Sequence, residues 1–93
     1  MIKHIVVWRL KDKADAPRVK QEIESMRGRI RGLVTLEVGI NFLVDSAAAD
    51  VALYSEFEDR VAFDSYAEHP VHVPVKRFVG ALVAERQVVD YEV

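Results

Sequence analysis

Residues 2–10, with the sequence IKHIVVWRL, predict a strand that has apolar side chains on both of its faces. β-Branched residues favour strands, and successive side chains of a strand point to opposite faces. One face would carry Ile2, His4, Val6 and Trp8, and the other Lys3, Ile5, Val7 and Arg9. A strand of this kind has to be covered on both sides, so the chain must place a packed layer against each face.

The segment after this strand predicts a helix. Pro17 fits the first helical turn, where its missing N–H leaves no hydrogen bond unmade. An apolar stripe with helical spacing follows, and its members are Val19, Ile23, Met26 and Ile30. Gly32 fits the end of this helix, because glycine readily takes the left-handed conformation that closes a helix.

Two more strands and a second helical region come next. Residues 33–44 alternate, and one face would carry Val34, Leu36, Val38, Ile40 and Phe42. Residues 51–57, VALYSEF, predict a third strand, and Asp59 can cap the helix that follows it. That helix should end near His69, because Pro70 disfavours helical geometry in the residue before it. A further helical piece carries Val75, Phe78, Val79 and Leu82.

The element order is therefore β-α-β-β-α-β, with residues 86–93 as the last strand and the second helical region in two pieces. Right-handed crossovers turn this order into an α+β, ferredoxin-like fold, a four-stranded antiparallel sheet with helices on one face. Residues 51–57 also have apolar side chains on both faces. Since the helices cover only one face, we expect a second copy of the chain to cover the other. The sequence thus predicts a single domain, residues 1–93, that forms a homodimer through the sheet face.

The composition excludes several classes of function. The 13 basic and 15 acidic residues give a formal net charge of −2, which does not supply the basic surface on which nucleic-acid affinity depends. The absence of cysteine excludes disulfides and thiolate chemistry. The N-terminus lacks the features of a signal peptide, and no apolar run approaches the roughly 18 residues of a membrane span. We therefore expect a cytoplasmic protein with no nucleic-acid or membrane partner and no cofactor.

Residues 64–78, DSYAEHPVHVPVKRF, hold two of the three histidines, two of the three prolines and a tyrosine. Histidine titrates near neutrality and suits a general base, whereas a tyrosine hydroxyl can stabilise a developing oxyanion. An intramolecular aldol-type cyclisation needs both functions. His72 is the candidate base and Tyr66 the candidate acid.

A purely structural role explains the same residues. His69 could bond to carbonyls exposed at a helix end, and Tyr66 could bury its ring while its hydroxyl finds a partner. His72 could hydrogen-bond to His4 or to the backbone and lock the helical region onto the sheet. A metal site is a weaker alternative, because Pro70 breaks the helical face that an H-x-x-H spacing would share and no cysteine or paired carboxylates complete a shell. We therefore predict no metal.

Four segments of the chain follow one another in the order and spacing of a known family. They are IKHIVVWRLK, GLVTLEVGIN, SEFEDRVAFDSYAEHPVH and VVDYEV. The most specific element among them is YxxHPxH, formed by Tyr66, His69, Pro70 and His72. Through these segments the chain resembles, nearly end to end, the stress-responsive A/B barrel domain family of dimeric α+β barrels. One departure is Arg31, where the family often has proline before the glycine. The resemblance implies two sheets, one from each subunit, packed face to face with the helices outside.

The resemblance does not decide the function. The family includes plant stress proteins without settled chemistry and a polyketide cyclase that forms olivetolic acid. In that cyclase, positions matching Tyr66 and His72 carry the chemistry and a histidine matching His4 lines the pocket, but a further histidine corresponds to Val51 here. One implied function is binding of a small apolar or aromatic metabolite between sheet and helices, by His4, His69, Tyr66 and His72. The alternative is a cyclase-like or isomerase-like enzyme with His72 as general base and Tyr66 as general acid.

Overall fold

The structure, a computed structural model, describes residues 1–93. Its strands are β1 (Ile2–Leu10), β2 (Leu33–Ile40), β3 (Val51–Phe57) and β4 (Val83–Glu92). Its helices are α1 (Ala16–Glu24), α2 (Arg60–Tyr66) and α3 (His72–Leu82), and a short 3-10 helix (Lys13–Asp15) precedes α1. These elements confirm the predicted βαββαβ order, with the second helical region divided into α2 and α3.

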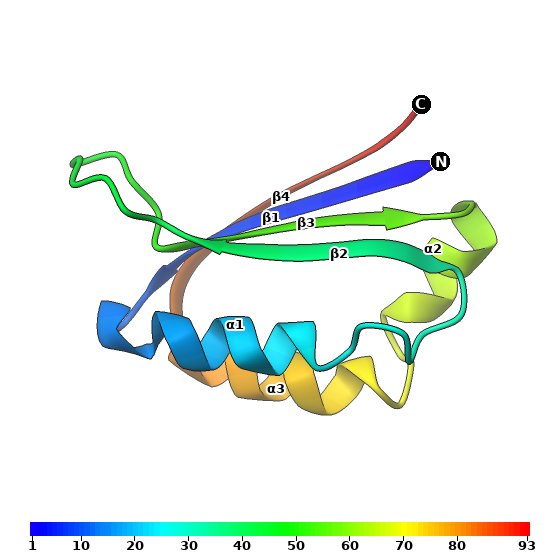
Figure 1. Ribbon diagram of the computed structural model, residues 1–93, viewed down its shortest axis with the longest axis horizontal. Coiled ribbons are helices and arrows are strands. Elements are labelled where there is room, and N and C mark those ends of the chain that lie inside the picture. Colours follow the sequence, from blue (N-terminus) through cyan, green and yellow to red (C-terminus); the bar gives the residue numbers. More distant parts are fainter.

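The four strands form one antiparallel sheet in the order β2-β3-β1-β4. Figure 1 shows α1 and α3 side by side beneath this sheet, α2 at one end, and no element on the opposite side. The predicted ferredoxin-like α+β fold is therefore confirmed. No helix is long and apolar enough to cross a membrane.

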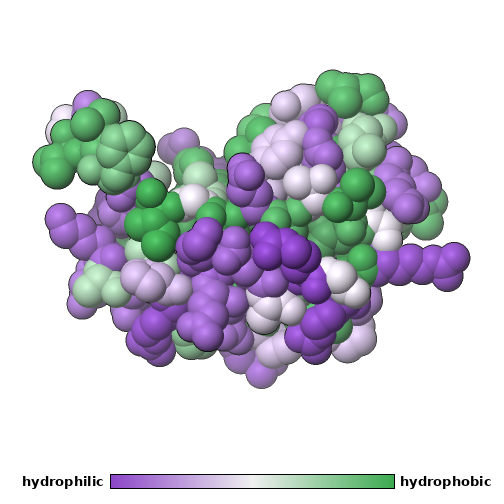
Figure 2. Space-filling model, in the orientation of Figure 1, coloured by the Kyte–Doolittle hydropathy of each residue, from purple (hydrophilic) through white to green (hydrophobic).

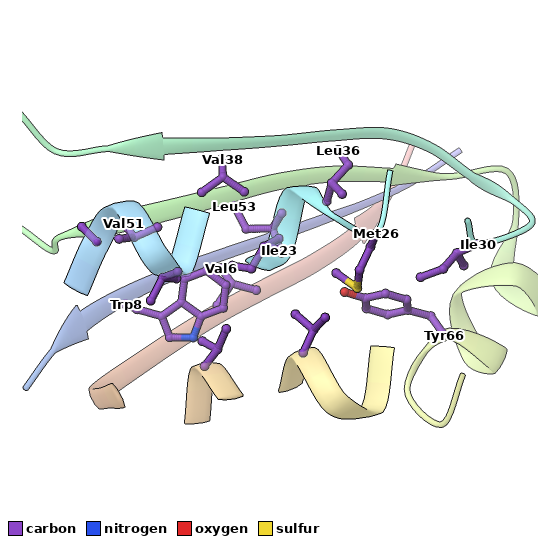
Figure 3. Close-up of a cluster of buried hydrophobic side chains, with 14 of the residues drawn as sticks. Val6, Trp8, Ile23, Met26, Ile30, Leu36, Val38, Val51, Leu53 and Tyr66 are labelled. Atoms are coloured by element: carbon purple, nitrogen blue, oxygen red, sulfur yellow. The ribbon is translucent and has the colours of Figure 1, made fainter. Parts of the chain in front are cut away.

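The core lies between the sheet and the helices. The side chains of β1 that point into it are Ile2, His4, Val6, Trp8 and Leu10. Figure 3 shows residues of the sheet, among them Val6 and Leu53, meeting Ile23 of α1. Phe57 of β3 is completely buried, with 0% of its surface exposed. Each fully buried side chain of this size contributes about 1.5–3 kcal/mol through the hydrophobic effect, so the sheet and helices depend on this layer for their mutual position.

The first helix is shorter than the sequence predicts. It ends at Glu24 and not near Gly32, and the chain continues through turns in which Gly28 has a positive φ of 77°. Met26 and Ile30 of the predicted stripe are buried as expected, although they lie in these turns and not on the helix. The apolar pattern identified the residues of the core correctly but not the backbone that carries them.

The second strand also differs from its prediction. The register of β2 against β3 shifts between Leu33 and Thr35, so Val34 has no partner in the ladder and points outward. The strand ends at Ile40, and Phe42 lies in the following loop, 95% exposed. Of the predicted apolar face, the buried members are Leu36 and Val38. A bulge places two residues opposite one and interrupts the alternation on which the prediction depended.

The helix α2 begins as predicted and ends slightly early. The side chain of Asp59 accepts a hydrogen bond from the backbone N–H of Ala62, at 2.9 Å, and so caps the helix. The helix ends at Tyr66, three residues before His69, and α3 starts at His72. This short connection brings Tyr66 and His72 together from two different helices.

The face of the sheet that no helix covers, which we call the bare face, is partly apolar. The side chains that β1, β3 and β4 place on it include Ile5, Val7, Tyr54, Val89 and Tyr91. Val89 is 52% exposed. In Figure 2 the upper outline, on the side where Figure 1 shows the bare face, is hollowed between hydrophobic surface over the loop that joins β2 and β3 and hydrophobic surface near the two termini. An apolar sheet face of this kind is typical of an interface.

Gly32 allows α2 to pack closely against the turn that precedes β2. Its φ is +86°, and a Cβ at this position would lie only 2.4 Å from the Cβ of Ala62 in α2. Gly28 also has a positive φ, +77°, but a Cβ there would meet no atom within 4 Å. Gly28→Ala should cost about 1–2 kcal/mol from the left-handed backbone alone, and Gly32→Ala should cost about 1–3 kcal/mol more from overpacking.

Urea unfolding of the two variants measures this difference, with Gly28→Ala as the matched control for the backbone effect. Equal losses of unfolding free energy in the two variants would show that Ala62 does not constrain Gly32.

Candidate functional site

A cavity of about 700 Å³ lies between the sheet and the helices. Most of its lining is apolar and includes Val6, Trp8, Leu53, Val75 and Val79. Its polar and charged lining residues are His4, Asp64, Tyr66, His72, Lys76, Arg86 and Asp90. Ligand pockets commonly have volumes of about 300–1,000 Å³ and combine apolar walls with a few polar groups. The cavity therefore has the size and lining of a small-molecule site.

His4 is held in the cavity wall by the sheet. Its Nδ1 shares a hydrogen bond with the carboxylate of Asp90, its register partner across β1 and β4. Its ring packs near Phe63 at a centroid distance of 5.5 Å and near Tyr66 at 6.0 Å. The Asp90 carboxylate can only accept when ionised, so Nδ1 carries a proton in this bond. The arrangement fixes the orientation of the imidazole at the cavity wall.

Tyr66, the last residue of α2, is buried, yet its hydroxyl has no hydrogen-bond partner in the chain. No side-chain nitrogen or oxygen is both fully buried and unpaired, so this hydroxyl is accessible from the cavity that it lines. In Figure 3 the side chain of Tyr66 extends from its helix into the layer between sheet and helices. Burial raises the pKa of Tyr66 to about 12, although the charge of Arg86 acts in the opposite direction. The hydroxyl is thus a protonated donor at neutral pH.

His72, the first residue of α3, stacks on the ring of Tyr66, with centroids 3.9 Å apart and an interplanar angle of 19°. Its Nδ1 lies 3.1 Å from the carbonyl oxygen of Tyr66 and 3.2 Å from that of Ala67. Carbonyl oxygens only accept, so Nδ1 carries the proton and Nε2 of the neutral ring has a free lone pair. Burial lowers the pKa of His72 from 6.5, which favours this neutral form. His72 therefore offers a hydrogen-bond acceptor, or a base, next to a tyrosine donor.

His69 does not line the cavity. Its Nδ1 accepts a hydrogen bond from the backbone N–H of Val71 at 3.0 Å. Its carbonyl oxygen accepts from the N–H groups of His72 and Val73, at 2.9 and 3.0 Å. The residue shapes the turn that begins α3, but it accepts from backbone N–H groups, whereas the structural interpretation expected it to bond to carbonyls.

The structure thus brings three of the four predicted ligand-binding residues, His4, Tyr66 and His72, to one cavity. It adds Arg86 and Asp90, which the sequence analysis did not single out. Alternation along the last strand could have placed both on the face of β4 that points to the helices. Arg86 belongs to no motif, and Asp90 lies in the segment VVDYEV, which was used for the resemblance and not for a site. No group of three or more His, Asp or Glu side chains is arranged to hold a metal ion.

Fold and cavity together define a ferredoxin-like α+β protein with an internal cavity beneath its sheet. The stress responsive A/B barrel domain matches residues 2–93, and the chain belongs to this family. A dimeric protein of unknown function from Bacteroides fragilis is 32% identical, with a TM-score of 0.84, over 99% of this chain and 95% of that one. A member of the same family with a ferredoxin-like fold from Mesorhizobium loti is 25% identical, with a TM-score of 0.83, over 99% and 95% of the two chains.

A more distant structure extends the fold comparison. The hydroxynitrile lyase from Passiflora edulis is 15% identical, with a TM-score of 0.84, over 99% of this chain and 92% of that one. At this identity the likeness concerns the fold alone. No curated protein matches the sequence. These comparisons do not show the narrower resemblance to the polyketide cyclase, which stays a prediction.

Proposed function

We propose that the protein is a homodimer in which each subunit binds a small apolar or aromatic metabolite in the cavity beneath its sheet. The proposal rests on one observation. A mostly apolar cavity of about 700 Å³ contains two polar groups that have no hydrogen-bond partner in the chain. These groups are the hydroxyl of Tyr66 and Nε2 of His72. A ligand that displaces water from these groups has to supply their hydrogen-bond partners, because a polar group left buried without a partner costs about 1–3 kcal/mol.

The lining indicates how such a ligand would lie. Its apolar body would pack against Trp8, Val75 and Val79, and each Å² of apolar surface removed from water contributes about 25 cal/mol. A carbonyl or ether oxygen of the ligand could accept a hydrogen bond from Tyr66. A hydroxyl group of the ligand could donate to Nε2 of His72. Phenols, aryl ketones and hydroxylated aromatic compounds combine these features.

The bare face supports the homodimer. Its apolar side chains include Ile5, Val7 and Val89, and the relative that is 32% identical is dimeric. Two sheets that pack face to face would remove these side chains from water. The resulting assembly would place the helices and the cavities on the outside of the dimer, one cavity in each subunit.

One cluster of polar groups on the bare face is paired internally. The carboxylate of Glu56 accepts hydrogen bonds from Lys3, Tyr54 and Thr35. These bonds, with that from Lys3 first, lower the pKa of Glu56 to about 2. The cluster can therefore be covered by a second sheet without leaving an unpaired charge.

A second candidate function is proton-transfer catalysis, with His72 as general base and Tyr66 as general acid. The specific observation in its favour is the pairing of a neutral imidazole that has a free Nε2 with a protonated tyrosine hydroxyl on adjacent, stacked rings. His72 would remove a proton from carbon, and Tyr66 would donate a hydrogen bond to the resulting enolate oxygen. The lyase from Passiflora edulis is an enzyme with this fold, although no residue role is transferred from it at 15% identity.

Ligand binding can be followed through Trp8, because it lines the cavity and is the only tryptophan. We expect members of a panel of phenols, aryl ketones and polyketide-like lactones to change its fluorescence saturably and to raise the melting temperature. Gly80 also lines the cavity, and a Cβ there would meet no atom within 4 Å. Gly80→Leu should fill the space and abolish binding while the helix gains about 0.5–1 kcal/mol. The matched control Ala81→Leu should bind normally, and a panel without any saturable response would contradict the proposal.

The dimer depends on the bare face, and Val89 tests it. Val89→Glu places a charge where two sheets would meet, and an uncompensated buried charge costs about 3–5 kcal/mol. We expect the wild-type protein to be a dimer by native mass spectrometry and light scattering, and Val89→Glu to dissociate. Val61 on α2 is 77% exposed and lies away from the bare face, so Val61→Glu should remain dimeric. A wild-type monomer, or an intact Val89→Glu dimer, would rule out this interface.

Proton abstraction can be measured as exchange of the α-protons of 4-phenylbutan-2-one in D2O. We expect the protein to accelerate this exchange, His72→Ala to abolish the acceleration, and Tyr66→Phe to reduce it about 10²–10³-fold. The base is the neutral imidazole and its pKa is lowered from 6.5, so the rate should rise with pH below 6.5 and level off by neutrality. Unfolding free energies provide the control, since a large stability loss in His72→Ala with unchanged exchange would assign His72 a structural role only.

A further inference from the structure

Arg86 distinguishes this cavity from a simple apolar pocket. It lies on β4, it lines the cavity, and its register partner is Trp8 on β1, a second lining residue. We propose that the ligand is an apolar carboxylic acid whose carboxylate pairs with the guanidinium of Arg86. This inference rests on the proposed binding function and specifies the chemical class of the ligand.

The acidic residues of the cavity lining already have partners. Asp90 is bonded to His4, and Asp64 lies 4.0 Å from the guanidinium of Arg60 on the preceding turn of α2. Neither carboxylate forms an ion pair with Arg86. The acidic side chains of the cavity therefore leave Arg86 available to an incoming anion.

Of the two basic residues in the lining, only Arg86 has no partner. Lys76 donates a hydrogen bond to the carbonyl of Ala67 at 3.1 Å and lies 3.8 Å from the carboxylate of Glu68. The guanidinium of Arg86 forms neither a hydrogen bond nor an ion pair with any group of the chain. Arg86 is exposed as well as part of the cavity lining. A cation without a partner beside mostly apolar walls favours an anionic ligand, because a pair that a bound ligand partly shields from water attracts more strongly than one in bulk water.

The position of Arg86 relative to Tyr66 indicates where the anion would lie. The positive charge of Arg86 lowers the pKa of Tyr66 against the effect of burial, so the guanidinium is close enough to favour negative charge near this hydroxyl. The hydroxyl itself remains a donor. A carboxylate between the two groups would accept from both, and the planar fork of a guanidinium matches the two oxygens of a carboxylate.

The rest of the lining decides what the carboxylate is attached to. Beyond Arg86 the walls are formed largely by Trp8, Val6, Val75 and Val79, which suit an aryl or alkyl body. The protein as a whole has a formal net charge of −2, so it does not attract anions in general. Selection of an acid would therefore depend on this one guanidinium and not on long-range attraction.

A matched pair of probes tests the inference. 3-Phenylpropanoate and 3-phenylpropan-1-ol have the same hydrocarbon body and differ in the charge of the head group. Binding of each is titrated through Trp8 fluorescence and confirmed by calorimetry on the intact protein. We expect the acid to bind about tenfold or more tightly than the alcohol, the range of a hydrogen bond to a charged group.

Substitutions assign the difference to Arg86. Arg86→Gln should weaken binding of the acid about tenfold and leave binding of the alcohol unchanged. Arg86→Lys keeps the charge without the guanidinium fork and should give an intermediate affinity for the acid. Arg31→Gln removes the same charge from an exposed position that does not line the cavity and should have no effect.

The outcomes separate this inference from the proposed function. Equal binding of acid and alcohol, unaffected by Arg86→Gln, would overturn the inference and leave the cavity as a site for neutral apolar ligands. If neither probe and no compound of the aromatic panel binds, both the inference and the proposed function are wrong.

Discussion

The apolar character of both faces of β1 is the constraint on which the rest of this structure depends. The strand lies inside the sheet between β3 and β4, and its alternating side chains point either to the helices or to the bare face. The side that faces the helices carries the core residues Val6 and Trp8 and also His4 of the cavity. The other side carries Ile5 and Val7, for which the chain itself has no cover. One strand thus links the cavity of a subunit to the surface through which subunits would meet.

Much of the fold could be predicted because it depends on periodicity and on local backbone preferences. The alternation of residues 2–10, the proline at the start of α1 and the cap by Asp59 each act within a few residues. The same reasoning divided the second helical region at Pro70, although it expected the first piece to end near His69, whereas α2 ends at Tyr66 and α3 starts at His72. Alternation put His4 on the face of the first strand that carries Val6 and Trp8. The structure places it in the same cavity as Tyr66 and His72.

The parts that could not be predicted depend on contacts between distant segments. The bulge at Val34 and the early end of α1 at Glu24 are compatible with the apolar spacing, so spacing alone does not reveal them. Asp90 acquires its role only through the register of β4 against β1, which places it opposite His4. Arg86 becomes notable only when the partners of every other charged group in the cavity lining are known.

The structural and the chemical interpretations of the YxxHPxH element are compatible, because they use different atoms of the same ring. Nδ1 of His72 donates to carbonyl oxygens that follow the end of α2 and so joins the two helices. That bond also fixes the tautomer, which leaves the lone pair of Nε2 free on a ring that stacks on Tyr66. His72 thus closes the end of α2 through Nδ1 and presents a pre-oriented acceptor through Nε2. The bonds that hold the turn together therefore also fix the orientation of the His72 ring at the cavity wall.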